Sequence, residues 1–215
     1  MLRVSTGRPR GPYAKTAERR RVILDAALAA YAEAGSRGVS IKDIADRAGL
    51  SHTGVVHHFG TREALLTAVL EDRDAAAAEA YGEEAALWRT DMLAANAETP
   101  GLVKLFVDLA AAGAEADHPA HDFFVDRYQG LRERFRRAIE DRPPVAERPA
   151  PAGGIDAEWA ARMLIAATDG LQVQWLLDPA ATDIAADIGR LRDVLLDALD
   201  RKAERGDVAQ GDRPA

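Results

Sequence analysis

The sequence predicts an all-α fold. Hydrophobic residues make up 47% of the 215 residues, whereas aromatic residues make up only 6%. Ala and Leu, which favour helices, recur throughout, and runs of the β-branched residues that favour strands are scarce. Apolar side chains also recur at steps of three and four, which places them on one face of a helix. We therefore expect helices that bury a substantial common core.

The composition excludes several classes of protein. The chain has no cysteine, so disulfide frameworks, thiolate zinc sites and cysteine nucleophiles are ruled out. The basic N-terminus is not followed by an apolar stretch long enough for a signal peptide, and no run of about 18 apolar residues occurs. We expect no membrane partner and a cytoplasmic location.

The charge is distributed unevenly along the chain. The formal net charge is -7, but residues 1–62 carry a net charge of +6 and residues 63–215 a net charge of -13. A basic end attracts a polyanion, and an acidic remainder is repelled by it. This polarity predicts that the N-terminal part binds nucleic acid.

Residues 1–15 are predicted to form a flexible basic arm, because Gly, Pro and basic residues occur there without apolar periodicity. The Gly7-Arg8-Pro9 segment resembles the core of AT-hook peptides, whose arginines lie in the minor groove. Arg8 and Arg10 are therefore candidate DNA contacts, and a solvated basic tail is the alternative. A first helix is expected from Thr16, an N-cap candidate, to Ala34, before Gly35.

Two short helices are predicted next. Ser40 can cap the first, Asp43 stands at its capping-box position, and Gly49 can end it. Ser51 can cap the second, which continues to Phe59. Two short helices joined by a tight turn that contains glycine make a helix-turn-helix, so residues 16–60 are predicted to form a three-helix DNA-binding domain.

The rest of the chain is predicted to form a larger helical domain over residues 61–203. Its first helix begins at Thr61. Further helices are expected near residues 83–97, 100–116, 119–142, 156–177 and 183–203, with Pro100, Pro119 and Pro179 at boundaries where proline is tolerated. Residues 143–154 are rich in Pro and Gly and are expected to form an exposed loop, and residues 204–215 a disordered tail.

The stretch from Arg21 to Asp74 resembles the DNA-binding region of the tetracycline-repressor (TetR) family. The matching positions are Ile23-Leu24, Ala26-Ala27, Gly35, Ser40, Ile44-Ala45, Ala48-Gly49-Leu50-Ser51, His58-Phe59, Arg62-Glu63 and Leu65-Leu66. The segment from Asp169 to Pro179 is also similar to the penultimate helix of many such regulators.

The resemblance implies nine or ten helices, a homodimer formed through the last two helices, and a small-molecule pocket in the middle of the larger domain. It also implies a bacterial transcriptional regulator, most commonly a repressor, that is associated with the nucleoid when it is bound to DNA. One position departs from the family pattern, because the family usually has Tyr where this chain has Val56. Val56 lacks the phenol that would contact a phosphate or a base, and it can at most touch a thymine methyl group.

The motif assigns two kinds of DNA contact. Residues near the start of the second helix of a helix-turn-helix reach base edges, so His52, Thr53 and His57 are predicted to read bases. Phosphate contacts are expected where helices begin and where cations lie. Gly54 is expected to let the backbone approach the DNA closely, and Arg62 to contact DNA rather than pair with Glu63, its neighbour in sequence. The remaining predicted contacts, mostly to phosphate, are Ser40, Lys42, Ser51, His58, Thr61 and Arg62.

One helix-turn-helix covers too few base pairs for selective binding, so a homodimer on a pseudo-palindromic operator is predicted. The alternative is that the apolar stripes of the last two helices complete the core of a monomer. The residues predicted to form the dimer interface are Trp159, Ala166, Gly170, Ile184, Ile188, Leu191 and Leu195.

The larger domain is predicted to bind an unknown small organic effector that releases the protein from its operator DNA by a population shift. Bulky or polar side chains in that domain are the candidates for the pocket, and ordinary core positions are the alternative for each. They are Met92, Leu102, Phe106, Tyr128, Met163, Gln174 and Trp175.

Two rival interpretations remain open. His118 and His121, flanked by Asp117 and Asp122, could bind a metal in an enzyme, although this cluster lies at a helix start where such residues are also ordinary surface residues. No phosphate loop, nucleophile elbow or zincin motif is present, so we expect no enzyme activity and no cofactor. The second rival is a helix-turn-helix protein without a small-molecule ligand, which is controlled by a protein partner or acts as a structural DNA binder. Its larger domain would have no enclosed cavity.

Overall fold

The computed structural model describes residues 12–34, 38–81, 93–94, 98–142 and 155–208. Within these ranges it contains helices and no strand, which confirms the predicted all-α class. The labelled helices are α1 (Pro12–Ala34), α2 (Ile41–Ala48), α3 (His52–Phe59), α4 (Arg62–Tyr81), α6 (Pro100–Ala112), α7 (His121–Glu140), α8 (Ala157–Leu177) and α9 (Ile184–Val208).

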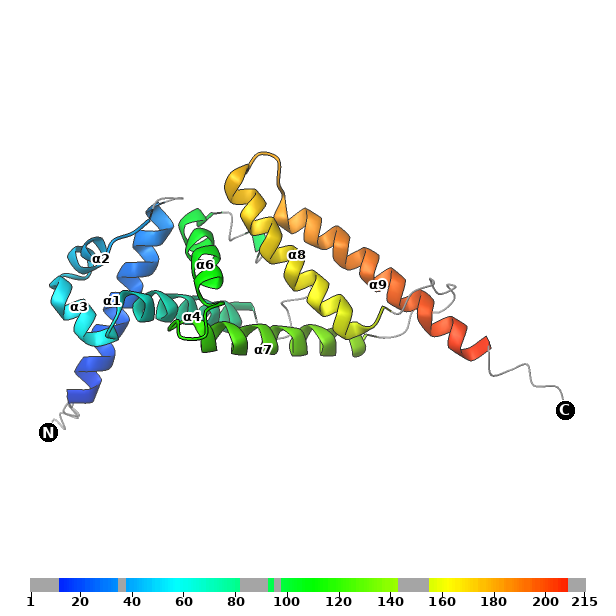
Figure 1. The fold of residues 1–215 in the computed structure, drawn as a ribbon, viewed down its shortest axis with the longest axis horizontal. Helices are drawn as coiled ribbons and strands as arrows, with labels where there is room; N and C mark the ends of the chain where they lie inside the picture. Colours follow the sequence, from blue (N-terminus) through cyan, green and yellow to red (C-terminus); the bar gives the residue numbers. More distant parts are fainter. Residues whose placement is uncertain (1–11, 35–37, 82–92, 95–97, 143–154, 209–215) are drawn as a thin grey trace, which may run out of the picture.

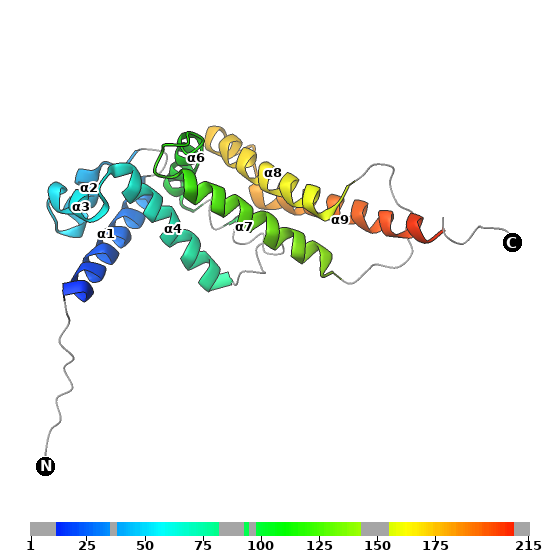
Figure 2. The ribbon, with the colours of Figure 1, turned by 60° about the horizontal axis from the view of Figure 1, so that its bottom comes forward.

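The molecule is elongated (Figure 1). Helices α1, α2 and α3 lie together at one end, α7, α8 and α9 extend toward the other, and α4 and α6 lie between them. Figure 2 shows the same order from a second side, with α7 and α8 next to each other. No helix in the described ranges is both long and apolar enough to cross a lipid bilayer.

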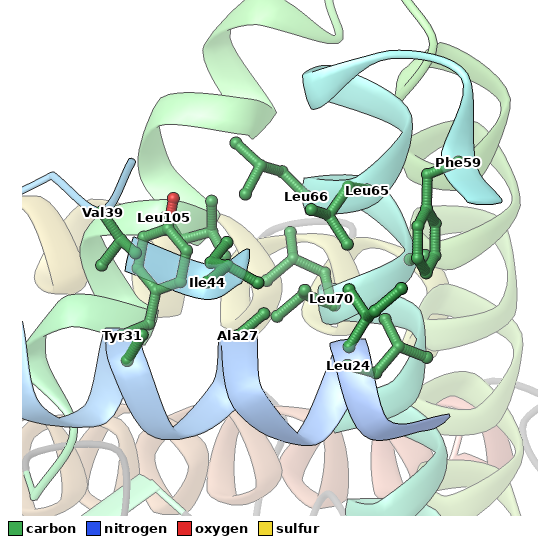
Figure 3. Close-up of a cluster of buried hydrophobic side chains, with 14 of the residues drawn as sticks. Leu24, Ala27, Tyr31, Val39, Ile44, Phe59, Leu65, Leu66, Leu70 and Leu105 are labelled. Atoms are coloured by element: carbon green, nitrogen blue, oxygen red, sulfur yellow. The ribbon is translucent and has the colours of Figure 1, made fainter. Parts of the chain in front are cut away.

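The first core is built by α1, α2, α3 and α4. Ile23 and Ala27 of α1, Ile44 of α2, Val55 of α3 and Val69 of α4 have no exposed surface. Figure 3 shows how neighbouring side chains from these helices meet, among them Leu24, Tyr31, Phe59, Leu65 and Leu70. The three- and four-residue spacing predicted from the sequence therefore places one face of each short helix inside this core.

This core continues past residue 60, where the sequence predicted a domain boundary. Leu102, Leu105, Phe106 and Leu109 of α6 are buried in the same cluster as the residues of α1 and α4. Helix α6 contacts both α1 and α4. The DNA-binding part therefore shares its core with the first helices of the larger domain.

The second core joins α8 and α9 to α6 and α7. Leu164 and Trp175 of α8 and Ile184, Ile188 and Leu195 of α9 are buried there. Helix α8 contacts α6, α7 and α9, so it is the central helix of this half. The inward-facing apolar residues of α8 and α9 are therefore buried within a single chain.

Several helix ends differ from the prediction. Helix α1 begins at Pro12, four residues before Thr16, so residues 12–15 belong to the helix and not to a flexible arm. Proline suits the first position of a helix because its missing N–H has no partner to lose there. Helix α9 continues to Val208, past the predicted end near residue 203.

The helix expected over 100–116 also ends early, at Ala112. Short-range backbone bonds follow, among them those from Gly113 N–H to the carbonyl of Leu109 and from Glu115 N–H to that of Ala112, and α7 then begins at His121. The helix expected over 83–97 lies largely outside the described residues.

Candidate functional site

Helix α2 is fixed at both ends by local contacts. The Ser40 hydroxyl accepts a hydrogen bond from the Asp43 N–H at 3.1 Å, and an Asp43 carboxylate oxygen accepts one from the Ser40 N–H at 3.0 Å. This is the complete capping box predicted from the sequence. The Ser40 hydroxyl also donates to the same carboxylate at 2.6 Å, and these bonds lower the pKa of Asp43. The capping box therefore sets the start of α2.

The turn between α2 and α3 depends on a glycine. Gly49 has φ of 66°, in the left-handed region that side chains disfavour. The Leu50 N–H then donates to the Ala45 carbonyl at 2.9 Å, which closes the end of α2. Ser51 caps α3 by accepting from the Gly54 N–H at 3.0 Å. The predicted helix-turn-helix is thus present.

Helix α3 has a buried side and an exposed side. Val55 and Phe59 are buried, whereas His52, Thr53 and His57 are exposed. The three residues predicted to read bases therefore share the solvent side of a short helix at one end of the molecule (Figure 1). Imidazole and hydroxyl groups can hydrogen-bond to base edges, so this surface can meet the major groove.

The other predicted contacts on α3 are less accessible. Gly54 and Val56 are half-buried, and Val56 packs against the first core. A Cβ atom at Gly54 would lie 3.2 Å from the Ser51 hydroxyl, so the glycine keeps this cap uncrowded. His58 is half-buried beside His57, with 6.0 Å between the ring centroids. Val56 thus contributes to packing as well as to the surface.

The predicted phosphate contacts flank α3. Ser40 and Lys42 are exposed at the start of α2, and Thr61 and Arg62 are exposed at the start of α4. The Thr61 hydroxyl caps α4 by accepting from the Ala64 N–H at 3.0 Å. The backbone N–H groups at such helix starts favour anions.

Arg62 does approach Glu63, contrary to the expectation that these neighbours would not face each other. The nearest atoms of the two charged groups, Nη1 and Oε1, are 3.9 Å apart, which is longer than a hydrogen bond. The Arg62 side chain is 50% exposed. A pair this open is weak, so the guanidinium can still turn toward a phosphate.

Arg20 is a further candidate contact, which is not among those predicted from the sequence. Its guanidinium lies 4.2 Å from the centre of the Phe59 ring and donates to the His58 carbonyl at 3.5 Å. The residue is exposed, so α1 places a cation beside the end of α3. The run Arg19-Arg20-Arg21 was the signal in the sequence. Arg8 and Arg10 lie outside the described residues.

The larger domain contains a cavity of about 120 Å³ between α4, α7, α8 and α9. Its walls combine apolar side chains with charged and amide groups. They are Arg73, Asp74, Ala77, Leu93, Arg127, Leu131, Phe135, Leu164, Ile165, Thr168, Asp169, Gln172 and Ile188. The rival without an effector predicted that no enclosed cavity would be found in this domain, and this cavity is partly open to solvent.

Polar contacts surround this cavity. The Arg127 Nε donates to the Asp74 carboxylate at 2.6 Å, and the Tyr128 hydroxyl donates to the Asp169 carboxylate at 2.7 Å. Burial raises the pKa values of both Tyr128 and Asp169, and it lowers the pKa of Arg73. The walls can therefore orient a polar group on an otherwise apolar molecule.

None of the residues predicted to contact the ligand lines this cavity in the described structure. Leu102 and Phe106 are buried in the first core, Met163 packs on the second core, and Gln174 is exposed. Tyr128 reaches the cavity only through Asp169. Trp175 borders a different hollow of about 390 Å³ beside residues 179–185. Met92 lies outside the described residues.

The residues predicted for the dimer interface fall into two groups. Trp159, Ala166 and Gly170 of α8 are exposed, whereas Ile184, Ile188 and Leu195 of α9 are buried within the chain. Leu191 is half-buried and packs on the second core. The stripe of α9 therefore contributes to the core of the single chain.

The candidate metal cluster near α7 has other partners. The Nδ1 atom of His118 accepts from the Ala120 N–H at 3.1 Å, and the Nδ1 atom of His121 lies 2.9 Å from the Gly113 carbonyl, to which it can donate. Among the described residues no group of three or more His, Cys, Asp or Glu side chains could hold a metal ion. These two imidazoles cap the turn between α6 and α7.

Comparisons with known proteins match both halves of the chain. The family model described as "Bacterial regulatory proteins, tetR family" matches residues 23–69. The model described as "BetI-type transcriptional repressor, C-terminal" matches residues 83–204, which is more than half of the chain. The first match contains the helix-turn-helix, and the second contains most of the cavity.

Two curated relatives match over most of their length. The HTH-type transcriptional repressor Rv1474c of Mycobacterium tuberculosis is 26% identical over 90% of this chain and 87% of that protein. The HTH-type transcriptional regulator TtgR of Pseudomonas putida is 27% identical over 85% of this chain and 91% of that protein.

Solved structures share the fold. A TetR transcription regulator from Haloarcula marismortui matches with a TM-score of 0.62 and 19% identity, over 86% of this chain and 97% of that one. NalD, described as the secondary repressor of the MexAB-OprM multidrug efflux pump in Pseudomonas aeruginosa, matches with a TM-score of 0.56 and 21% identity, over 86% and 97%. The two family models, the relatives and the geometry of α2 and α3 agree: the chain belongs to the tetR family of bacterial regulatory proteins and is a DNA-binding transcriptional regulator.

Proposed function

We propose that this regulator represses transcription as a homodimer on a pseudo-palindromic operator, and that a small organic molecule in the cavity between α4, α7, α8 and α9 releases it. The observation that carries the proposal is the position of α4, which connects the two sites. This helix begins among the predicted phosphate contacts at Arg62 and lines the cavity at Arg73 and Asp74. The relative Rv1474c is named a repressor, which supports repression.

The exposed side of α3 supports sequence-specific binding. His52, Thr53 and His57 are free to meet base edges, while exposed side chains at the starts of α2 and α4 can hold phosphates on either side. Base contacts then discriminate between sequences, and phosphate contacts set the orientation of the protein. Because the target is chromosomal DNA, the regulator works in the cytoplasm.

An exposed stripe on α8 supports the homodimer. Trp159, Ala166, Gly170, Val173 and Leu177 recur at steps of three, four and seven, which places them on one face of the helix. All five are exposed in the single chain, with Leu177 at 82%. Val194 of α9 is also exposed, at 64%. Small and apolar residues in such a row let two helices approach closely and bury apolar surface.

The route from the cavity to DNA runs along α4. Arg62 and Arg73 are eleven residues apart, which is about 16 Å along a helix. Between them Leu65, Leu66 and Val69 are buried against α1, α2 and α3. A ligand that favours a shifted position of α4 would therefore misplace α3. Operator affinity would fall by the factor by which the ligand binds the shifted form more tightly than the DNA-binding form.

The DNA and effector parts of the proposal are tested by selecting binding sites from fragmented genomic DNA. The expected result is a set of fragments that share two half-sites in inverted orientation, followed by loss of binding when an effector is added. Selection of single half-sites would contradict the dimer. Release by no compound from a broad library of organic molecules would contradict the effector.

The dimer is tested separately with Gly170→Arg. No atom lies within 4 Å of a Cβ built at Gly170, so the variant can fold as a monomer. We expect sedimentation to show a dimer for the natural chain and a monomer for this variant, with unchanged circular dichroism. Arg137→Gln on α7 is the control, and a dimer that survives Gly170→Arg would place the interface elsewhere.

A further inference from the structure

One cation in the cavity wall has a nitrogen atom without a hydrogen-bond partner. The Nη1 atom of Arg73 is buried and makes no hydrogen bond in the described structure, and the Asp74 carboxylate that favours its charge is itself bound by Arg127. A buried N–H group without an acceptor loses its hydration and gains no hydrogen bond in return. Arg73 lines the cavity, so an incoming group could satisfy it there.

The other charged groups around the cavity are already engaged. Arg127 donates to Asp74 at 2.6 Å, and its guanidinium lies 4.8 Å from the centre of the Phe106 ring. Asp169 accepts from the Tyr128 hydroxyl at 2.7 Å. The carboxylates of Asp74 and Asp169 thus have donors within the protein, whereas the Nη1 donor of Arg73 still lacks an acceptor.

Gln172 adds a second unmet group. Its side chain is 6% exposed, and its Oε1 atom is buried without a hydrogen-bond partner. A side-chain amide can present either its oxygen or its nitrogen, so it can accept from or donate to a ligand. Leu131, Phe135, Leu164, Ile165 and Ile188 provide apolar walls around these two polar groups.

We propose that the cavity binds a small organic acid, with its carboxylate on Arg73 and its apolar body against the side chains of α7, α8 and α9. A carboxylate accepts charge-assisted hydrogen bonds from a guanidinium, which are stronger than neutral ones. The cavity of about 120 Å³ is close to the size of an apolar cavity that holds benzene, about 150 Å³. A single ring or a short branched chain fits this size.

The inference rests on the proposed effector function and names the chemical class of the effector. It also provides a contact through which effector binding would act on α4. Within the chain the Nη1 atom of Arg73 has no acceptor, whereas a bound carboxylate would hold this residue of α4 toward the ring of Phe135 and the rest of the pocket wall. The acid therefore acts on the helix that begins at the DNA surface.

The experiment compares three probes of similar size and different charge: benzoate, benzamide and benzylammonium. Binding of each to the full chain is measured by calorimetry, without DNA. We expect benzoate to bind most tightly. Arg73→Gln should weaken benzoate binding at least about tenfold and change benzamide binding little, because only the charge-assisted bond is lost.

Arg137→Gln is the matched control, since it removes one exposed arginine from α7 and leaves the cavity intact. Thermal unfolding of each variant shows whether it is folded. A second variant, Gln172→Leu, keeps Arg73 and fills the amide position with an apolar side chain. We expect it to retain the preference for benzoate over benzylammonium.

Tighter binding of benzylammonium than of benzoate would overturn the proposal and assign the cavity to a cation. Equal benzoate binding by the natural chain and Arg73→Gln would overturn it as well. Neither result bears on operator binding, which is measured separately on the selected DNA fragments. Failure of the DNA assay with intact benzoate binding would instead overturn the proposed function.

Discussion

The phosphate contacts can be tested by a change that leaves the fold untouched. Lys42 and Arg62 are exposed at the starts of α2 and α4, and within the described ranges neither makes a hydrogen bond that an uncharged side chain would break. Each cation that neutralises a DNA phosphate contributes about -0.9 to the slope of log affinity against log salt. In the proposed dimer each substitution removes two cations, so Lys42→Gln or Arg62→Gln should reduce the slope by about 1.8.

The assay is fluorescence anisotropy of a labelled operator fragment over a series of salt concentrations. Arg137→Gln removes the same charge from α7, which ends far from α3 (Figure 1), and its slope should match that of the natural chain. The reasoning is refuted if the slopes of Lys42→Gln and Arg62→Gln also match it. A loss of affinity with an unchanged slope would mean that these residues do not contact phosphates.

Three further predictions follow from the same geometry. Thr53→Ala should reduce the discrimination between bases at one base pair of each half-site by about 1–3 kcal/mol of binding free energy and change it little at the other base pairs. Binding to operators with single base substitutions measures this. Gly49→Ala should lower the free energy of unfolding by about 1–2 kcal/mol in urea titrations, because alanine disfavours the φ of 66° found there. Burial raises the pKa of Asp169 in the folded state, because it penalises the ionised carboxylate there. The free energy of unfolding of Asp169→Asn, relative to that of the natural chain, should therefore increase as pH rises above the ordinary carboxyl pKa of 3.8. Paired denaturant titrations across that range check the sign, and a constant difference would contradict it.

The helix-turn-helix could be predicted because its signals are local. Ser40 and Asp43 are three residues apart, and their mutual hydrogen bonds depend only on the start of one helix. Gly49 and Ser51 likewise mark an end and a start within the same short segment. Each rule links residues within one turn, so the sequence alone identifies both helices and the exposed side of α3.

The cavity could not be predicted in the same way. Arg73, Arg127 and Gln172 come from α4, α7 and α8, and only the packing of these helices brings them together. Bulky side chains such as Phe106 are natural candidates for a pocket wall, but bulk is equally useful in a core, and Phe106 lies in the first core. The periodicity of α9 has the same ambiguity, because it shows that Ile188 faces something apolar and does not show which helix.

The shared core has a consequence for how an effector can act. Helix α6 is buried against α1 and α4 in one continuous cluster, so the DNA-binding helices are not joined to the rest by a flexible hinge. Closely packed cores do not deform gradually, and they move between a few discrete arrangements. The proposed effector would therefore have to favour a second packing of α4 against α1 and α6, in which the two copies of α3 in the proposed dimer no longer match the spacing of the operator.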